Sequence, residues 1–234
     1  MTQSTGPTSP GTVLVTGGAS GLGAAVVAAV GEAGGRPVCL DRVRTDADVE
    51  QEVVDLADTR AAEDAVRTVS GRVGGLDAVV TCAGTDACGR LEDVAAKDWD
   101  RVVLVNLLGT VAVVRAALPD LLERRGHVVT VASTLGVRAL SDATAYSASK
   151  FGVVGFSRAL AAETQGRLST TMLVPGGMHT SFFDGRDPKY MPPPDAKLNR
   201  PENVAQTVMF ALAQPSGCEV RELVVTPSVE GSWP

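Results

Sequence analysis

A glycine-rich turn near the start of the chain constrains its fold more than any other feature. The turn spans residues 16–23 (TGGASGLG), between an apolar run over 12–16 and an Ala- and Val-rich segment over 21–33. A strand, a glycine turn and a helix in this order let the backbone approach a pyrophosphate, which the free N–H groups of the helix N-terminus attract. The spacing therefore predicts a dinucleotide-binding loop, although a plain turn is the alternative for glycine-rich sequence alone.

The rest of the chain alternates strand-like and helix-like segments. We predict further strands over 37–40, 77–81, 127–132, 168–174 and 222–226, and helices over 59–73, 99–122, 143–163 and 201–213. This alternation predicts an α/β fold, a Rossmann-type doubly wound parallel β-sheet flanked by helices on both faces. Residues 11–234 are expected to form a single domain after a flexible tail over 1–10. The proline-containing stretch 175–200 is expected to be a substrate lid.

Composition narrows the class of function. The chain has 27 acidic against 21 basic residues and no basic cluster, which disfavours nucleic-acid binding. With two histidines, and four cysteines that lack paired ligand spacing, no metal site is expected. The start of the chain lacks the pattern of a signal peptide, and the apolar run over 102–114 is too short to span a bilayer. We therefore expect a cytoplasmic protein with reduced thiols and no membrane partner.

An acidic residue at the end of the second predicted strand bears on the cofactor. Asp41 stands 18 residues after Gly23, close to the spacing at which an acid binds the ribose hydroxyls of a dinucleotide. Its carboxylate would repel a 2′-phosphate, so the pattern favours NAD over NADP. The neighbouring Arg42 leaves NADP possible, because a guanidinium there could hold that phosphate. An ordinary turn carboxylate is the other interpretation.

Two residues four apart on a predicted helix are candidates for proton transfer. Tyr146 and Lys150 share one helix face, and a nearby ammonium lowers the pKa of a phenol towards neutrality. Ser133, after the strand that ends at residue 132, can donate to a carbonyl oxygen, although it can equally cap a turn. No Gly-x-Ser-x-Gly elbow is present, and this disfavours a hydrolase.

Taken in order, these motifs resemble those of the short-chain dehydrogenase/reductase family over residues 12–226. The resemblance implies an NAD(P)-dependent oxidoreductase that transfers a hydride between a nicotinamide and an alcohol or carbonyl substrate. It implies four catalytic residues: Asn106, Ser133, Tyr146 and Lys150. It also implies that the cofactor is bound by Gly17, Ser20, Gly21, Leu22, Gly23, Asp41, Asp55, Leu56, Ala83, Gly84, Tyr146, Lys150, Pro175, Gly176 and Thr180.

Tyr146 would then be the general acid/base, Lys150 would bind the nicotinamide ribose and tune Tyr146, Ser133 would hold the substrate oxygen, and Asn106 would position a water. The chain departs from the family pattern at Thr81-Cys82, where two asparagines are usual. We expect Thr81 to restore one of the lost hydrogen bonds and Cys82 to fill space in the core.

Fewer features of the sequence bear on partners and substrate. The apolar helix over 99–122, together with the family's habit of pairing long helices, predicts a homodimer or homotetramer. Apolar residues in the lid suggest an apolar alcohol or ketone as substrate. Trp233, near the end of the chain, is expected either to dock on a partner or pocket or to be loose. Two alternatives stay open: an NADPH-dependent biosynthetic ketoreductase, and a non-catalytic NAD-binding Rossmann module.

Overall fold

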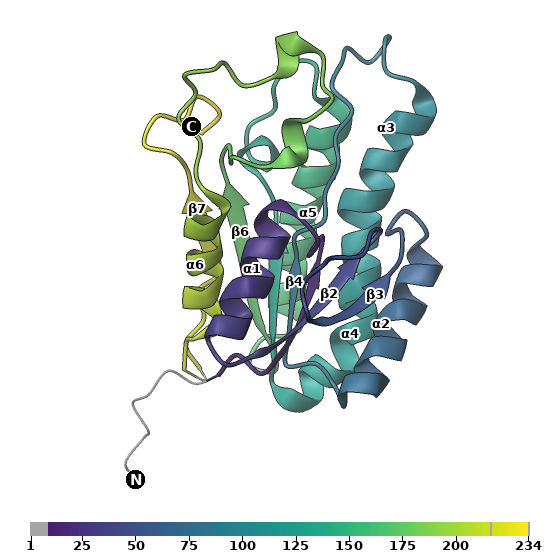
Figure 1. The fold of residues 1–234 in the computed structure, drawn as a ribbon, viewed down its shortest axis with the longest axis vertical. Helices are drawn as coiled ribbons and strands as arrows, with labels where there is room; N and C mark the ends of the chain where they lie inside the picture. Colours follow the sequence, from purple (N-terminus) through teal and green to yellow (C-terminus); the bar gives the residue numbers. More distant parts are fainter. Residues whose placement is uncertain (1–8, 216, 234) are drawn as a thin grey trace.

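A computed structural model describes residues 9–215 and 217–233 of the chain. Within them the chain forms one parallel sheet of seven strands, in the order β3-β2-β1-β4-β5-β6-β7, with helices on both faces (Figure 1). The predicted fold class is therefore confirmed. The expected tail over 1–10 lies outside the described residues except for its last two positions. Of these, Ser9 donates a hydrogen bond from Oγ to the carbonyl of Gly34.

Apart from β3, the elements follow one another as the alternation predicts. The strands are β1 (Thr12–Thr16), β2 (Arg36–Asp41), β3 (Glu50–Val53), β4 (Ala78–Thr81), β5 (His127–Val131), β6 (Ser169–Pro175) and β7 (Glu222–Val225). The helices are α1 (Gly21–Glu32), α2 (Thr59–Val73), α3 (Ala96–Val103), α4 (Thr110–Arg124), α5 (Thr144–Glu163) and α6 (Pro201–Leu212). Short 3-10 turns lie at Thr134–Gly136, Ser181–Phe183 and Pro188–Tyr190.

The sheet is buried on both faces, which is why its central strands read as unbroken apolar runs. On one face α1 and α6 pack together over residues such as Val13, Val15 and Val80. On the other face α2, α4 and α5 cover residues such as Leu14 and Val79. Alternate residues of β1 thus enter different cores, as the two-residue period of a strand requires.

The strand β3 was missed by the sequence analysis. Its residues, Glu50–Val53, are half-buried or exposed and show no apolar alternation. β3 pairs only with β2, at the edge of the sheet, with Cys39 opposite Gln51. An edge strand needs few apolar residues, because ladder hydrogen bonds along one side hold it in place.

The long apolar helix extends further than predicted and contains an irregular segment. α3 passes through a π-helical turn, Leu104–Gly109, into α4, so that the helix runs from Ala96 to Arg124. By length and composition alone this helix could cross a membrane, and the apolar run over 102–114 is only part of it. Half of its most apolar window is buried inside the fold.

Candidate functional site

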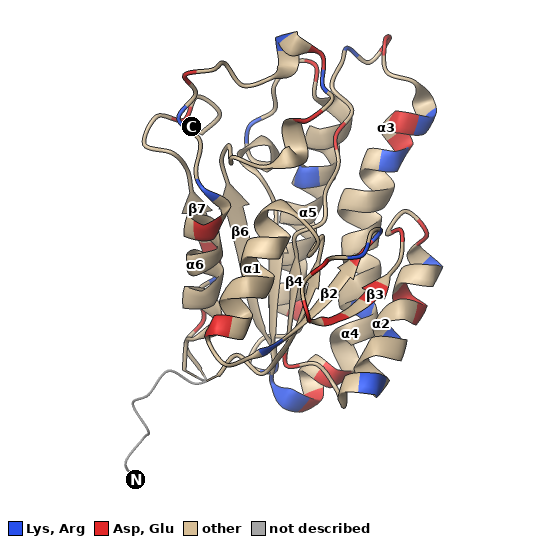
Figure 2. Cartoon of the chain, in the orientation of Figure 1, with Lys and Arg blue, Asp and Glu red and all other residues tan. Residues whose placement is uncertain are grey.

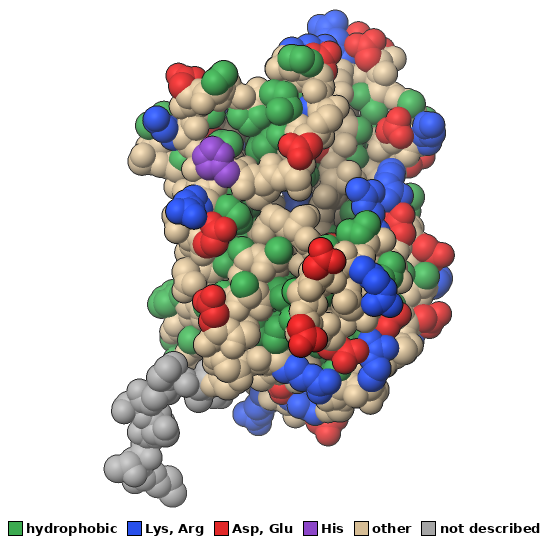
Figure 3. All heavy atoms as spheres, in the orientation of Figure 1, with side chains coloured by type: hydrophobic (Ala, Val, Ile, Leu, Met, Phe, Trp, Pro, Cys, Tyr) green, Lys and Arg blue, Asp and Glu red, His purple; other side chains and the backbone are tan. Residues whose placement is uncertain are grey.

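The expected site residues, with the exception of the buried Asn106, line a groove along the carboxyl ends of the strands. The sheet order reverses direction between β1 and β4, and ligands of open α/β sheets bind in the crevice at such a switch point. The groove has a volume of about 1290 Å³ and runs from the glycine loop to the stretch over 175–200. Figure 3 shows a hollow between the loops at the top of the molecule and α1, bordered in part by hydrophobic side chains.

The glycine turn forms a cradle in which side chains would clash with the backbone. A Cβ on Gly17 would lie 2.8 Å from the Cα of Ala83, and one on Gly23 would lie 2.0 Å from the carbonyl oxygen of Gly17. Gly17 and Gly21 have φ of +68° and +52°, a region that favours glycine. The N-terminus of α1 follows at once, so its free N–H groups face the groove. Backbone shape and partial charge at this position suit a pyrophosphate.

Asp41 lies at the end of β2, next to this cradle. One carboxylate oxygen accepts a hydrogen bond from the N–H of Ala19 at 3.0 Å, and the other accepts from Val43 at 3.2 Å. These bonds hold the carboxylate beside the glycine loop, on the lining of the groove. Arg42, the next residue in the chain, lines the groove as well.

Asp55 and Leu56 follow β3 and line the groove further along. The hydrogen bond from the N–H of Ala57 and the ion pair with Arg101, at 2.9 Å, lower the pKa of Asp55 below its ordinary value. Leu56 is buried against the π-helical turn, where a Cβ on Gly109 would lie only 2.8 Å from the Leu56 Cβ.

The loop after β4 is tied to the sheet differently from expectation. The Thr81 hydroxyl is buried and has no hydrogen-bond partner among the described residues, so the expectation that it restores a lost bond is wrong. The tie comes instead from Thr16, whose Oγ1 accepts from the N–H of Ala83 at 3.1 Å. Cys82 packs against the core as expected and also faces the groove, and burial raises the pKa of its thiol to about 12.

Asn106 sits in the π-helical turn and is buried. Its side-chain amide accepts from the N–H of Thr85 at 2.8 Å and donates to the carbonyl of the same residue at 2.9 Å. It also donates to the Ser149 hydroxyl at 3.0 Å. A Cβ on Gly84 would lie 3.6 Å from the Asn106 Oδ1. The π turn therefore aims an amide at the loop after β4 and at α5, and π turns often occur at functional sites.

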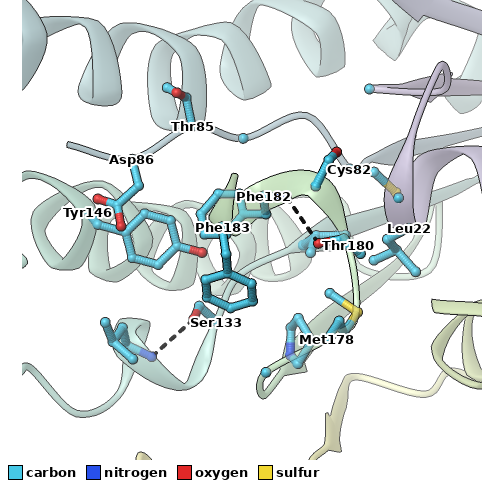
Figure 4. Close-up of a pocket in the computed structure, with 18 of the residues that line it drawn as sticks. Leu22, Cys82, Thr85, Asp86, Ser133, Tyr146, Met178, Thr180, Phe182 and Phe183 are labelled. Atoms are coloured by element: carbon cyan, nitrogen blue, oxygen red, sulfur yellow. Dashed lines mark hydrogen bonds between the residues drawn. The ribbon is translucent and has the colours of Figure 1, made fainter. Parts of the chain in front are cut away.

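Three polar side chains converge at the centre of the groove. Tyr146 and Lys150 share one face of α5, with the Lys150 Nζ 5.6 Å from the centroid of the Tyr146 ring. Ser133 precedes the 3-10 turn after β5 and accepts a hydrogen bond from the N–H of Leu135 at 3.2 Å. The serine thus caps a turn and lines the groove at once. In Figure 4 the Tyr146 hydroxyl points into the pocket, towards the space between Ser133 and Phe183.

Burial shifts both titratable groups of this cluster towards their neutral forms. It raises the pKa of Tyr146 to about 12, a shift that the neighbouring Ser133 hydroxyl opposes. It lowers the pKa of Lys150 to about 8. The Lys150 ammonium donates to the carbonyl of Val131 at 2.9 Å, which holds it at the end of β5. A positive charge near the Tyr146 phenol would favour its phenolate form, and the phenol could then give up or take a proton.

The stretch after β6 supplies one side of the groove's lining. Pro175 ends β6, Gly176 donates from its N–H to the carbonyl of Val225, and Thr180 caps a 3-10 turn by accepting from Phe182. A Cβ on Gly21 would lie 3.2 Å from the Thr180 Cγ2, so this segment reaches the glycine cradle. His179 is exposed and does not line this groove.

Sequence reasoning missed two sets of residues at the site. Asp86 and Arg186 form an ion pair at 3.1 Å on the wall of the groove. Glu230 and Ser232, from the segment after β7, bond to the loops beside Ser133 and Gly176. No sequence motif joins these residues, because they meet only through the fold. Figure 2 shows the other charges spread over the outer faces of helices such as α2 and α3.

Comparison with known proteins agrees with this geometry. A family model described as short chain dehydrogenase matches residues 11–190. An uncharacterized oxidoreductase of Staphylococcus aureus is 29% identical over 226 residues, covering 92% of this chain and 96% of its own.

Two solved structures have similar folds. The ligand-free aldohexose dehydrogenase of Thermoplasma acidophilum has a TM-score of 0.82 and 23% identity, over 92% of both chains. An alcohol dehydrogenase of Thermococcus sibiricus complexed with 5-hydroxy-NADP has a TM-score of 0.83 and 22% identity, over 92% of this chain and 95% of its own. At these identities the two structures bear on the fold alone.

Proposed function

The chain belongs to the short-chain dehydrogenase family of oxidoreductases, and from this premise we propose that it interconverts an alcohol and a carbonyl compound with NAD. The observation that carries the proposal is the convergence of Ser133, Tyr146 and Lys150 in one groove with the glycine cradle. A sensor of dinucleotides needs the cradle but has no use for three polar side chains around one reaction space.

The cradle and its surroundings would hold the cofactor. Gly17, Ser20, Gly21, Leu22 and Gly23 line the phosphate end of the groove. Asp41 would accept hydrogen bonds from ribose hydroxyls, and Asp55 with Leu56, which line the groove further along, would contact the adenine. Ala83, Gly84, Pro175, Gly176 and Thr180 line the path towards Tyr146. A dinucleotide bound there supplies or accepts the hydride, and the protein's residues handle the proton.

Tyr146 is proposed as the general acid in carbonyl reduction and as the general base in alcohol oxidation. Its hydroxyl enters the same space as Ser133, whose hydroxyl can donate to the substrate oxygen and stabilise developing charge. The Val131 carbonyl holds the Lys150 Nζ 5.6 Å from the centroid of the Tyr146 ring, where its positive charge would favour the phenolate. The Asn106 amide, tied to the loop after β4, would position a water at the solvent side of Lys150.

NAD is the favoured cofactor on the position of Asp41. A carboxylate fixed beside the glycine loop by two N–H groups would repel a 2′-phosphate through its negative charge. Arg42 lines the same part of the groove and is the feature that supports NADP. Comparing kcat/KM for NADH and NADPH separates the two, and equal values would remove the argument from Asp41.

A homo-oligomer is also proposed, built on the long helices. Leu108 is 44% exposed on the π turn and Phe151 is 45% exposed on α5. These helices pack side by side, since a Cβ on Gly152 would lie 2.6 Å from the Leu107 Cδ2. Two large apolar side chains on one pair of helices suit burial against a second copy. Sedimentation of the full chain, and of a Leu108→Glu/Phe151→Glu variant, tests this.

The proposed activity is tested by following NADH and NADPH absorbance with a panel of ketones and secondary alcohols. Tyr146→Phe should reduce kcat by about 10²- to 10⁴-fold and leave NADH affinity, measured by calorimetry, within about twofold. Tyr190→Phe removes a hydroxyl from the other tyrosine of the chain and should keep most of the activity. Full activity in Tyr146→Phe would refute the acid/base role. Tight NADH binding without turnover of any substrate would favour the non-catalytic alternative.

A further inference from the structure

The pocket wall beside Tyr146 holds an ion pair that is unlike the others in the molecule. Asp86, on the loop after β4, and Arg186, on the loop after β6, have side chains only 8% and 15% exposed. Among the described residues this is the only ion pair in which both side chains are less than a fifth exposed. Removing two charges from water costs free energy even when they attract each other, and removing one partner leaves the other charge buried alone. This pair therefore remains in the pocket at a cost in stability.

The two charges face the reaction space and not the solvent. Both residues line the groove that contains Tyr146 and Ser133. Asp86 lies beside the Tyr146 ring (Figure 4), close enough that its charge raises the pKa of the tyrosine while Arg186 lowers it. A substrate whose oxygen reaches Tyr146 therefore passes along this wall.

The Arg186 guanidinium also organises the lid. Its central carbon lies 4.6 Å from the ring centroid of Phe182 and 4.7 Å from that of Phe183, which places the cation against both rings. Phe182 in turn contacts Tyr146, with ring centroids 5.6 Å apart. A continuous set of contacts thus runs from Asp86 through Arg186 and Phe182 to Tyr146.

We propose that Asp86 and Arg186 select substrates by their charge. The pocket wall that carries this ion pair admits uncharged ketones and alcohols and rejects ionic ones. This inference rests on the proposed oxidoreductase function. An anionic substrate would meet the Asp86 carboxylate, and a cationic one would compete with the Arg186 guanidinium for Asp86 and the two phenyl rings. An uncharged substrate disturbs neither, and it packs against Phe182 and Phe183. Repulsion between a charge of the protein and a like charge of the ligand is a common means of rejecting a wrong ligand.

The test uses three methyl ketones of similar size: methyl butyl ketone (uncharged), levulinate (an anion) and acetonyltrimethylammonium (a cation). The purified full chain should reduce the uncharged ketone with a kcat/KM at least about tenfold above that for either ion, mainly through KM. Arg186→Met leaves an unpaired carboxylate and should raise kcat/KM for the cation, relative to that for the uncharged ketone, by about tenfold. Asp86→Asn leaves an unpaired guanidinium and should raise the relative kcat/KM for the anion by a similar factor.

Two further variants keep the outcome interpretable. Arg186→Lys retains the charge and should retain the order of the three ketones. Arg90→Met breaks an exposed pair with Glu92 outside the groove, whose side chains are both 71% exposed, and should change none of the ratios. An NADH affinity equal to that of the wild-type chain, measured by calorimetry for each variant, would show that the fold and the cradle are intact.

The opposite shifts of cation and anion are what a purely structural role would not produce. If Arg186→Met and Asp86→Asn lowered kcat/KM for all three ketones by one common factor, the charge-selection proposal would be overturned. If the wild-type chain reduced no ketone with either NADH or NADPH, the proposed function itself would fail, and this result is distinct from the first.

Discussion

The ammonium of Lys150 donates a hydrogen bond to the carbonyl of Val131, at 2.9 Å, and so lies at the end of β5 beside Tyr146. This bond fixes the amine near the proposed proton donor. Lys150→Met keeps much of the shape of the side chain but removes its charge. We expect kcat to fall by about 10²-fold or more, measured by NADH consumption. Lys97→Met, on an exposed turn of α3, is the control and should be neutral. Unchanged kcat in Lys150→Met would contradict the role of the charge.

Asp41→Ser should shift cofactor preference towards NADP. The change removes a carboxylate that repels a 2′-phosphate and leaves Arg42 to attract it. We expect the ratio of kcat/KM for NADPH to that for NADH to rise by about tenfold, a difference of about 1.4 kcal/mol. Asp46→Ser, which changes an exposed carboxylate on the same loop, should leave the ratio unmoved. An unaltered ratio in Asp41→Ser would mean that this carboxylate does not face the ribose.

Glu230→Ala should weaken the hold on the nicotinamide end of the cofactor. The Glu230 carboxylate accepts from the N–H of Gly177 at 3.0 Å and from the Ser232 N–H and hydroxyl. Burial tends to raise the pKa of Glu230, but these hydrogen bonds outweigh it and the pKa lies below its ordinary value. The carboxylate is therefore an ionised brace behind Pro175-Gly176.

In Glu230→Ala we expect the Kd for NADH to rise about fivefold, as loss of a charge-assisted bond would cause, while the Kd for ADP-ribose stays constant. ADP-ribose lacks the nicotinamide, so it reports on the rest of the site. Glu202→Ala, on the exposed first turn of α6, serves as the control. Equal losses for both ligands would show a general loosening and not a local brace.

Thr81→Val should stabilise the protein. The Thr81 hydroxyl is buried at the end of β4 without a hydrogen-bond partner among the described residues, and valine has the same shape without the polar group. We expect the free energy of unfolding to rise by about 1 kcal/mol in urea denaturation. Thr16→Val is the matched comparison, because the Thr16 hydroxyl accepts from Ala83 and its loss should destabilise. A loss of stability in Thr81→Val would indicate that a water satisfies this hydroxyl.

His127 should make the fold sensitive to acid. Burial lowers the pKa of His127 from 6.5 to about 4, while its Nε2 bonds to the Thr171 hydroxyl at 2.8 Å. Between these pH values the unfolded chain binds a proton that the folded chain does not, so stability falls as the pH falls from 6.5 to 4. His127→Gln should lose less stability over that range, by about 2 kcal/mol at pH 4.5, in urea denaturation. Parallel stability curves for the two proteins would contradict the shift.

Much of the fold could be predicted because local sequence and final packing agree. The run over 12–16, the glycine turn and the helix after it each favour the element they form. α6 begins at Pro201, where a proline suits the first turn of a helix. The edge strand β3 could not be predicted, since its polar residues are held by pairing with β2 and not by a buried face of their own.

The sequence by itself determined the order of the motifs, because the glycine spacing and the i, i+4 placement of Tyr146 and Lys150 are local properties of the chain. Only the tertiary structure decided that Asp86 meets Arg186 and that Glu230 reaches Gly177, which are partners at least 53 residues apart. Such contacts arise where loops from different strands gather at one edge of the sheet. No local pattern encodes them, since each residue's environment there is made by segments distant in the chain.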